Sequence, residues 1–272
     1  MPQTTDTLNL EDHAKQISSS LKKSIPSPLS DDFRKMGIHT WKGRMVNEHG
    51  SAVVFEGLHR QLSQLHTNDP SFISNTELEK VLSFATEERR HGILCAAVSH
   101  SLGGDAIAPA LPTEEFPMHE DCSLLAGCIR NLLSVCCLSE TVAVALIAAE
   151  REEMPDGAIR SLLTEIWSDE CGHANFGWNL VQRLWQHTTT QDKKDINAYL
   201  AIAFAHLEDH ELRHLPLHNV QHFPQEASAI GLCNGNTARA LFYATVEGII
   251  IVGLNNIGLS ATTAWDKRHI PV

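Results

Sequence analysis

Apolar residues recur every three or four positions along most of this chain, which is the spacing of helices that bury one face. The pattern predicts helices over about 42–67, 75–101, 120–152, 156–186, 191–215 and 236–259. The alternating valine- and isoleucine-rich segments typical of strands do not occur, so we expect an all-α fold. Residues 1–35 are rich in Ser, Thr, Asp and Pro, and they predict a flexible N-terminal arm before a single helical domain over 36–272.

Two copies of the motif Glu-x-x-His lie on apolar faces of the predicted helices. A single copy would be weak evidence in a chain with 16 histidines, but here a further glutamate precedes each copy by 32 or 30 residues. The full set is Glu56, Glu88, His91, Glu140, Glu170 and His173. Four carboxylates on core faces need a compensating charge, because a buried carboxylate without a partner is costly. Metal cations supply that charge, so the set predicts a dinuclear metal site.

The heights of the glutamates in their helical hairpins support this set. Residues at the same height in an antiparallel helix pair are equally far from the turn. Position 72, halfway between Glu56 and Glu88, falls in the turn-forming sequence 67–74. Position 155, halfway between Glu140 and Glu170, is a proline between the third and fourth predicted helices. Both glutamate pairs are therefore expected to be level across their own hairpins.

These motifs and this topology resemble the ferritin-like di-iron carboxylate superfamily over about residues 42–186. The resemblance implies a four-helix bundle of two antiparallel hairpins joined by the long connection 102–119, with about two additional C-terminal helices over about 191–259. No subfamily is identified. Cys95 stands where the small subunit of ribonucleotide reductase has a tyrosine, and Ile166 stands where the arylamine N-oxygenases have an extra histidine.

The resemblance implies two iron ions, with Fe/Mn or Mn/Mn as alternatives, held by the six residues above. It also implies dioxygen as co-substrate and an external electron donor or reductase. The expected function is that of an oxygenase or oxidase that oxidises a small organic substrate. Two alternatives remain open: a ferroxidase- or peroxidase-type metal-handling protein without an organic substrate, and a structural bundle without turnover.

Further residues are assigned with less support from the pattern. Asp169 and Glu87 each precede a motif glutamate, and we expect them to orient ligand imidazoles. His59 is a candidate extra ligand, although a surface position is favoured. Glu48 lies eight residues before Glu56, ~12 Å along a helix, and is expected to be too far away to share the site. The predicted pocket residues are Val53, Phe84, Leu133, Cys137, Val144, Ile147 and Ile166. His206, His210 and His214 are expected to form a solvated face rather than a metal site.

Composition limits which binding partners and which cellular compartment we expect for the protein. The formal net charge is −12 without a basic cluster, so neither nucleic acid nor an anionic membrane is an expected partner. The apolar stretch 240–259 is interrupted by polar residues and is expected to be a buried helix. Seven cysteines without a Cys-x-x-Cys pair, and no signal peptide pattern, favour reduced thiols in a cytoplasmic protein. The C-terminal helices are expected to pack on the bundle or to form a homodimer surface.

Overall fold

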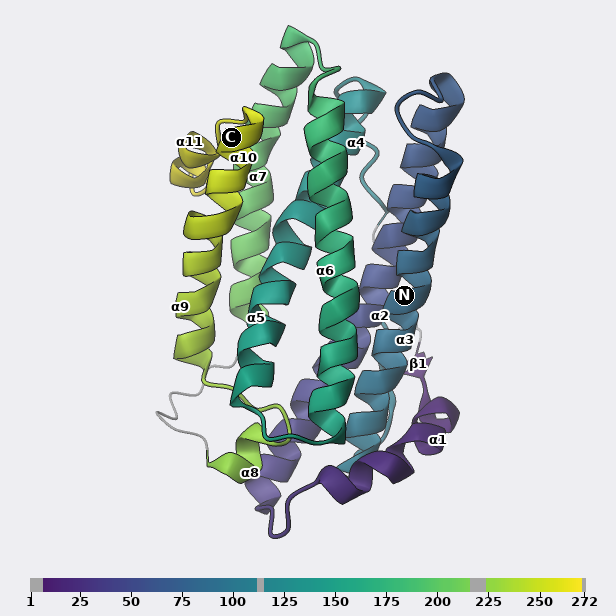
Figure 1. Cartoon of the computed structure of the whole chain (residues 1–272), viewed down its shortest axis with the longest axis vertical. Helices are drawn as coiled ribbons and strands as arrows, with labels where there is room; N and C mark the ends of the chain where they lie inside the picture. Colours follow the sequence, from purple (N-terminus) through teal and green to yellow (C-terminus); the bar gives the residue numbers. More distant parts are fainter. Residues whose placement is uncertain (1–6, 112–114, 216–223, 271–272) are drawn as a thin grey trace, which may run out of the picture.

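The protein is almost entirely helical in a computed structural model that describes residues 7–111, 115–215 and 224–270. The core of the arrangement is two helical hairpins that lie side by side (Figure 1). The first consists of α2 (Asp31–Asn68) and α3 (Asn75–Ser101). In the second, α4 (Leu124–Leu132), the π-helix η2 (Leu133–Ser139) and α5 (Glu140–Glu153) form one continuous rod, which packs on α6 (Ala158–Trp185).

Local sequence signals fix the ends of the first hairpin. The Ser30 side chain accepts a hydrogen bond from the Phe33 amide, so α2 begins eleven positions before the predicted residue 42. Ser74 and Glu77 form a capping box at the start of α3, which places the cap one residue before Asn75. The two turns lie at opposite ends of the molecule, so the connection from α3 to α4 runs the length of the helices (Figure 1). The predicted long crossover is therefore present.

The connection packs closely on α2. Phe116 lies against Gly57, where an added Cβ would come within 2.3 Å of the phenyl ring. The Gln61 side chain donates a hydrogen bond to the Met118 carbonyl at 3.1 Å. A glycine on α2 therefore makes room for the crossover and fixes its path.

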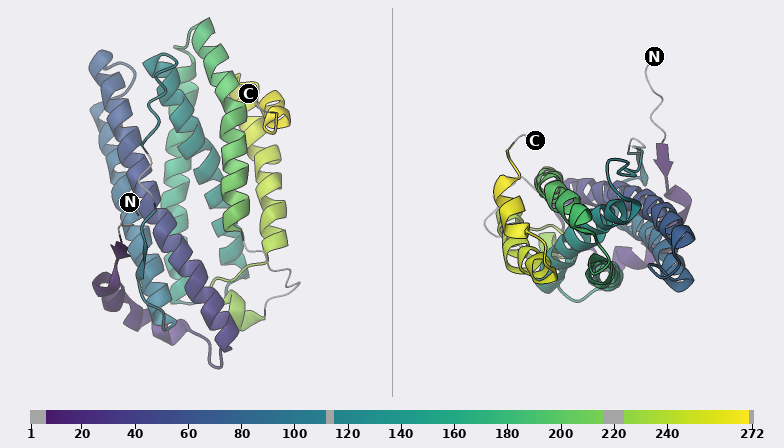
Figure 2. Two further views of the ribbon diagram at one scale, coloured as in Figure 1. Left: turned by 180° about the vertical axis from the view of Figure 1, so that it is seen from behind. Right: turned by 90° about the horizontal axis from the view of Figure 1, so that it is seen from above.

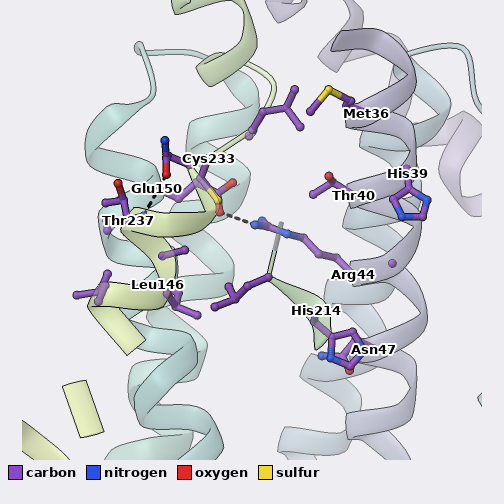
Figure 3. A pocket seen from close by; sticks show the side chains of 18 of the residues that line it. Met36, His39, Thr40, Arg44, Asn47, Leu146, Glu150, His214, Cys233 and Thr237 are labelled. Carbon is purple, nitrogen blue, oxygen red and sulfur yellow. Dashed lines mark hydrogen bonds and ion pairs between the residues drawn. The ribbon is translucent and has the colours of Figure 1, made fainter. Parts of the chain in front are cut away.

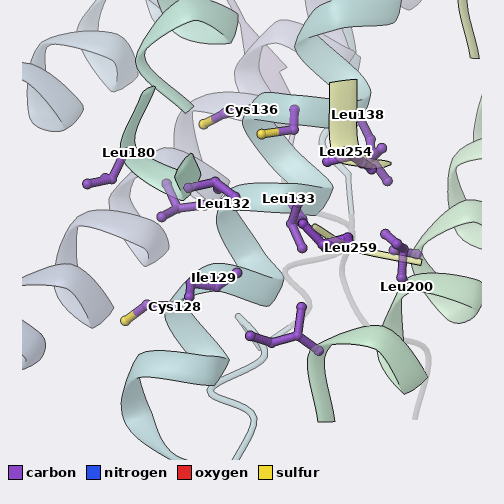
Figure 4. Packing of buried hydrophobic residues seen from close by; sticks show 14 of the residues in the cluster. Cys128, Ile129, Leu132, Leu133, Cys136, Leu138, Leu180, Leu200, Leu254 and Leu259 are labelled. Atoms are coloured by element: carbon purple, nitrogen blue, oxygen red, sulfur yellow. The ribbon is translucent and has the colours of Figure 1, made fainter. Parts of the chain in front are cut away.

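The C-terminal helices form a further layer on the second hairpin. They are α7 (Thr190–His214), α8 (Gln225–Ser228), α9 (Gly235–Thr245), the π-helix η3 (Val246–Ile250), α10 (Ile251–Ile257) and α11 (Ala261–Lys267). Figure 2 shows this layer and the α2/α3 hairpin on opposite sides of the second hairpin. Leu200, Leu254 and Leu259 meet Leu133 and Leu138 in the apolar core between them (Figure 4).

The N-terminal segment is more ordered than its composition predicts. The strand β1 (Thr7–Asn9) pairs with β2 (Ile107–Pro109) in the crossover, and α1 (Glu11–Leu21) with the short 3₁₀ helix η1 (Lys22–Ser24) packs across α3. Leu8, Ala14 and Leu21 are buried. Residues 7–35, for which the composition predicts a flexible arm, therefore pack against the rest of the molecule through apolar contacts that include these three side chains. Residues 1–6 lie outside the described part of the chain.

Two stretches have the length and hydropathy of a membrane span, Leu124–Glu153 and Gly235–Ile257. Core helices of soluble proteins pass the same test, so this observation is weak evidence for a membrane. The first stretch is the continuous helix of α4, η2 and α5 in the second hairpin. The second exposes Ile249 and Val252, and is less buried than the sequence predicts.

Candidate metal centre

Four helices bring a buried cluster of carboxylates and imidazoles together at the middle of the two hairpins. Within the described residues, two groups have ligand atoms that all lie within 4.8 Å of one another. The first group is Glu48, Glu88, His91 and Glu170, and the second is Glu88, Glu140, Glu170 and His173. Glu88 and Glu170 belong to both groups. The cluster therefore has two halves that share two carboxylates.

His91 is the histidine of the first group. Its Nδ1 lies 3.3 Å from Glu170 Oε1 and 3.6 Å from Glu48 Oε2. Its other ring nitrogen, Nε2, lies 3.0 Å from Asp169 Oδ2. A proton on Nε2 would be donated to Asp169 and would leave the Nδ1 lone pair directed at the carboxylates.

His173 is the histidine of the second group, and its contacts follow the same pattern. Its Nδ1 lies 2.9 Å from Glu170 Oε2 and 3.2 Å from Glu88 Oε1, while Nε2 lies 2.8 Å from Glu87 Oε2. The Phe84 ring packs on this imidazole with its centroid 4.3 Å away. The ring is thus fixed by a hydrogen bond on one side and an aromatic contact on another.

Two further carboxylates, Asp169 and Glu87, lie at the outside of the cluster, and each contacts a histidine of the opposite hairpin. Asp169 precedes Glu170 on α6 but contacts His91 of α3, and Glu87 precedes Glu88 on α3 but contacts His173 of α6. The structure therefore places both carboxylates on ligand-type imidazoles, as the sequence predicts. Each carboxylate also ties one hairpin to the other.

The carboxylate that α2 contributes to the cluster is Glu48, and the structure places the predicted Glu56 outside both ligand groups. Glu56 is 37% exposed and pairs with Arg89 at 2.6 Å on the outside of the hairpin. Eight residues turn a helix by two full turns and about 80° more, so Glu48 and Glu56 cannot face the same site. Glu48 also lies two turns, ~12 Å, before Glu56 along α2, so the hairpin midpoint selected neither the height nor the face of the contributing carboxylate.

A signal for Glu48 was present in the sequence. The fully buried residues Trp41, Met45, Ala52 and Phe55 follow one another at helical spacing on α2, and Glu48 fits between Met45 and Ala52. Gly92 of α3 lies opposite, where an added Cβ would come within 3.8 Å of Glu48 Cβ and 3.3 Å of the Met45 carbonyl. The apolar stripe, read from Trp41, selects Glu48 rather than Glu56.

A π-helix places the carboxylate of α5. The segment η2 ends at Ser139, directly before Glu140. The wider turn brings Cys136 against Gly177 of α6, where an added Cβ would come within 2.1 Å of Cys136 Cβ. Single wide turns of this kind are frequent at functional sites in helical proteins. Here the turn and the glycine together allow α5 and α6 to approach closely beside Glu140 and Glu170.

The electrostatics of the cluster show how its charges depend on one another. Burial, reinforced by the neighbouring Glu170, raises the pKa of Glu88 and of Glu140 well above the ordinary value. Burial opposes the charged forms of the histidines, but Glu170 with Glu48 raises the pKa of His91 to about 11, and Glu170 with Glu87 raises that of His173 to about 10. In the absence of a metal, two protonated imidazoles are the cations that offset the carboxylates.

The donor set fits divalent metal ions. Glu88 Oε1 and His91 Nδ1 are buried without a hydrogen-bond partner in the described structure, as expected of atoms that need a ligand other than protein. Glu88, Glu140 and Glu170 are 1%, 7% and 3% exposed, so water does not solvate their charge. Carboxylate and imidazole together suit iron, manganese and zinc. Metal ions would take the place of the protons on the imidazoles.

Other predicted residues have different surroundings. His59 is half-buried on α2 outside both ligand groups, and His206, His210 and His214 lie exposed on α7, also outside them. Of the predicted pocket residues, Phe84, Leu133, Cys137 and Ile166 are buried packing residues, Val144 and Ile147 are half-buried, and Val53 is 41% exposed.

A cavity lies beside the cluster, but none of the predicted pocket residues lines it. Residues of α2, α5 and the segment before α9 enclose a volume of about 500 Å³ (Figure 3). Its lining includes Glu48, Arg44 and Glu150, with Leu146 in the position that Ile147 was expected to occupy. The predicted pocket residues therefore lie outside this cavity.

Comparison with known proteins adds no assignment, since no family model and no curated protein matches the chain. The established finding is an all-helical protein with a buried carboxylate–histidine cluster that is compatible with a di-iron site.

Proposed function

We propose that this protein is a non-haem di-iron oxygenase or oxidase that uses dioxygen to hydroxylate, desaturate or N-oxygenate a small organic substrate. The observation that carries the proposal is the pair of four-residue groups that share Glu88 and Glu170. In this proposal Glu48, Glu88, His91 and Glu170 would hold one iron, and Glu88, Glu140, Glu170 and His173 would hold the other. Fe/Mn and Mn/Mn pairs use the same ligand types.

The arrangement of the helices supports a place in the ferritin-like superfamily. Two antiparallel hairpins, a long crossover and one ligand group from each core helix are features of that fold. The clustered residues differ from the set predicted from sequence only in the glutamate of α2, which is Glu48 instead of Glu56.

The chain itself would bind the metals, orient their ligands and exclude water. Iron held by these residues would supply the redox chemistry toward dioxygen, with an external donor as the source of electrons. Asp169 and Glu87 hold the two imidazoles in one orientation each. Phe55 and Phe84 cover His173 with ring centroids at 5.1 and 4.3 Å, which keeps this side of the centre dry.

The alternative of a ferroxidase or peroxidase without an organic substrate is less well supported. A path for iron would be lined mainly by carboxylates, whereas the cavity beside Glu48 combines Glu48, Glu150 and Glu153 with apolar walls that include Met36, Leu146, Leu232 and Leu241. Cavities of several hundred Å³ that combine apolar walls with placed polar groups are typical of small-molecule sites.

Dioxygen consumption by the iron-loaded protein tests the proposal. Protein loaded anaerobically with two equivalents of Fe(II) should consume dioxygen faster in the presence of an added organic compound, with formation of an oxidised organic product. The Glu88→Ala variant should lose this activity together with its iron, while Glu56→Ala should keep both. Iron oxidation at the same rate with every compound, and without any organic product, would instead establish the ferroxidase alternative.

A further inference from the structure

The cavity beside the metal centre contains one feature that the proposed function leaves unused. Arg44 of α2 extends across the cavity to Glu150 of α5, and the two side chains form an ion pair (Figure 3). Glu48 lies on the cavity wall one helical turn from Arg44, about 6 Å along the helix axis. The same cavity therefore contacts both the ion pair and a candidate metal ligand.

Arg44 is held in place and still has donors to offer. Its guanidinium lies 4.9 Å from the centroid of the Trp41 ring, and one amino group, Nη2, donates to Glu150. Within the described parts of the chain, no other acceptor bonds to Arg44, and its side chain remains 25% exposed. A guanidinium has five N–H donors in a rigid plane, so Arg44, which lines the cavity, has donors beyond the one used by Glu150.

Glu150 cannot easily release Arg44. Glu150 is 7% exposed, and its Oε1 is buried without a hydrogen-bond partner in the described structure. Gly231, at φ +81°, closes over this carboxylate, and a Cβ there would come within 2.8 Å of Oε1. Burial opposes the charge on Arg44, but the attraction of Glu150 outweighs it and raises the pKa of Arg44 above its ordinary value. The pair is a fixed, charged anchor with unused donors and no unused, accessible acceptor.

We propose that Arg44 anchors the oxygen head group, a carboxylate or a carboxamide, of a small organic substrate whose apolar body extends along the cavity toward Glu48. The inference rests on the proposed function, because it takes the cavity to be where the substrate of the metal centre binds. At the Arg44–Glu150 end of the cavity, donors without an accessible acceptor select a head group that accepts hydrogen bonds, and they disfavour an ammonium group at that end. The apolar walls select the rest of the molecule.

Three probes with the same alkyl chain test the head group, namely hexanoate, hexanamide and hexylamine. Binding to the full chain is measured calorimetrically in the metal-free protein, because a free carboxylate is itself a metal ligand. Hexanoate or hexanamide should bind at least about tenfold more tightly than hexylamine, since a hydrogen bond to a charged donor is worth that factor or more. The comparison of the first two shows whether the head group is charged.

Paired variants show whether Arg44 is the anchor. Arg44→Met combined with Glu150→Leu removes both charges, because removal of one alone would leave the other buried and unpaired. This double variant should bind the preferred probe at least about tenfold more weakly while it retains its thermal unfolding midpoint. Arg213→Met is the matched control, because Arg213 also lines the cavity but is mostly exposed and pairs with Asp209.

The inference is overturned if hexylamine binds as tightly as the other probes, or if the double variant binds the preferred probe like the unchanged protein. Metal content is measured separately on the same samples. Arg44-dependent binding in a chain that takes up no metal would refute the proposed function and leave the anchor in place. Normal metal uptake with Arg44-independent binding would refute the anchor alone.

Discussion

At the scale of the residue, the centre consists of imidazoles held between two kinds of carboxylate. Each histidine directs Nδ1 at the buried glutamates and Nε2 at an outer carboxylate, Asp169 for His91 and Glu87 for His173. The outer carboxylate fixes the plane of the ring before any metal binds, and it accepts the Nε2 proton that remains when a metal displaces the proton on Nδ1. The affinity of the site for metal should therefore depend on residues that do not touch the metal.

Replacement of Asp169 by Asn should weaken metal binding by roughly 10–100-fold, because the amide no longer accepts the Nε2 proton as a carboxylate does. Iron or manganese titration of the metal-free protein measures the change. Glu79→Gln, at an exposed position on the same helix as Glu87, is the control and should bind metal normally. An Asp169→Asn protein with unchanged affinity would show that this contact does not position His91.

Glu48 and Glu56 give the sharpest contrast between neighbouring carboxylates. Glu48→Ala should reduce the metal content of the purified protein, because one of the two groups loses a ligand. Glu56→Ala should leave the content unchanged, because Glu56 pairs with Arg89 outside the cluster. Metal analysis of the two variants beside the unchanged protein decides between them, and the opposite result would restore the ligand set predicted from sequence.

This contrast also shows what the sequence determined at the residue scale. The Glu-x-x-His motifs identified Glu88, His91, Glu170 and His173, because their spacing places both ligands on one helix face. Glu140 followed from its height in a hairpin with a short turn. Height failed on α2, because the contributing carboxylate lies two turns before Glu56 and on the buried stripe.

At the scale of the element, the π-helix η2 packs closely against Gly177 of α6. The wide turn over Leu133–Ser139 brings Cys136 so close to α6 that only glycine fits opposite it. The distance between α5 and α6 beside Glu140 and Glu170 therefore depends on this contact.

Gly177→Ala should destabilise the protein by about 1–3 kcal/mol, because the new methyl group overlaps the Cys136 side chain and helix backbones must move apart. Chemical denaturation measures the free energy of unfolding. Gly172→Ala is the control on the same helix, where the added Cβ meets nothing within 4 Å. That change should stabilise the protein by about 0.5–1 kcal/mol through helix propensity. Equal effects of the two substitutions would contradict the packing described here.

Helix spacing in the sequence predicted the six long helices but neither π-helix. A wide turn adds one residue and shifts the helical phase, but residues 132–138 are apolar at all positions but Ser134, so the shift leaves no visible break in the pattern. The short helix α1 was missed for a different reason. Its stability comes from contacts with α3 and from the β1–β2 pairing, and those contacts lie far away in sequence.

At the scale of the whole molecule, Glu208 connects three C-terminal segments. It accepts hydrogen bonds from Tyr243 of α9 at 2.9 Å and from Arg268, which follows α11, at 2.8 and 3.0 Å. The bond from Arg268 is the main reason that the pKa of Glu208 lies below its ordinary value of 4.5. The layer that covers the second hairpin is therefore stabilised by a charge that acid removes.

Glu208→Gln should lower the free energy of unfolding at pH 7 by about 1–3 kcal/mol, because hydrogen bonds to a charged acceptor are lost. A lowered folded-state pKa means that this stability is present above the ordinary value of 4.5 and disappears as the pH falls through the lower folded value. The difference between the variant and the unchanged protein should therefore shrink in acid. A difference that does not vary with pH would refute the role of the charge, and the exposed Glu247→Gln serves as control.

Metal binding should stabilise the whole fold, because the ligands come from all four core helices. Each site would add about 2.7 kcal/mol at a free metal concentration one hundred times its dissociation constant. Thermal unfolding with and without a chelator measures this effect. An identical midpoint in both conditions would show that no metal bridges the two hairpins.

The most direct test of the central claim is an anomalous-scattering map of crystals of the purified protein, recorded at the iron and manganese absorption edges. The account predicts two peaks inside the cluster, one beside Glu48 and His91 and the other beside Glu140 and His173, with Glu88 and Glu170 in contact with both. A map from metal-replete protein without a peak at this position, or with a metal bound at Glu56, would contradict it.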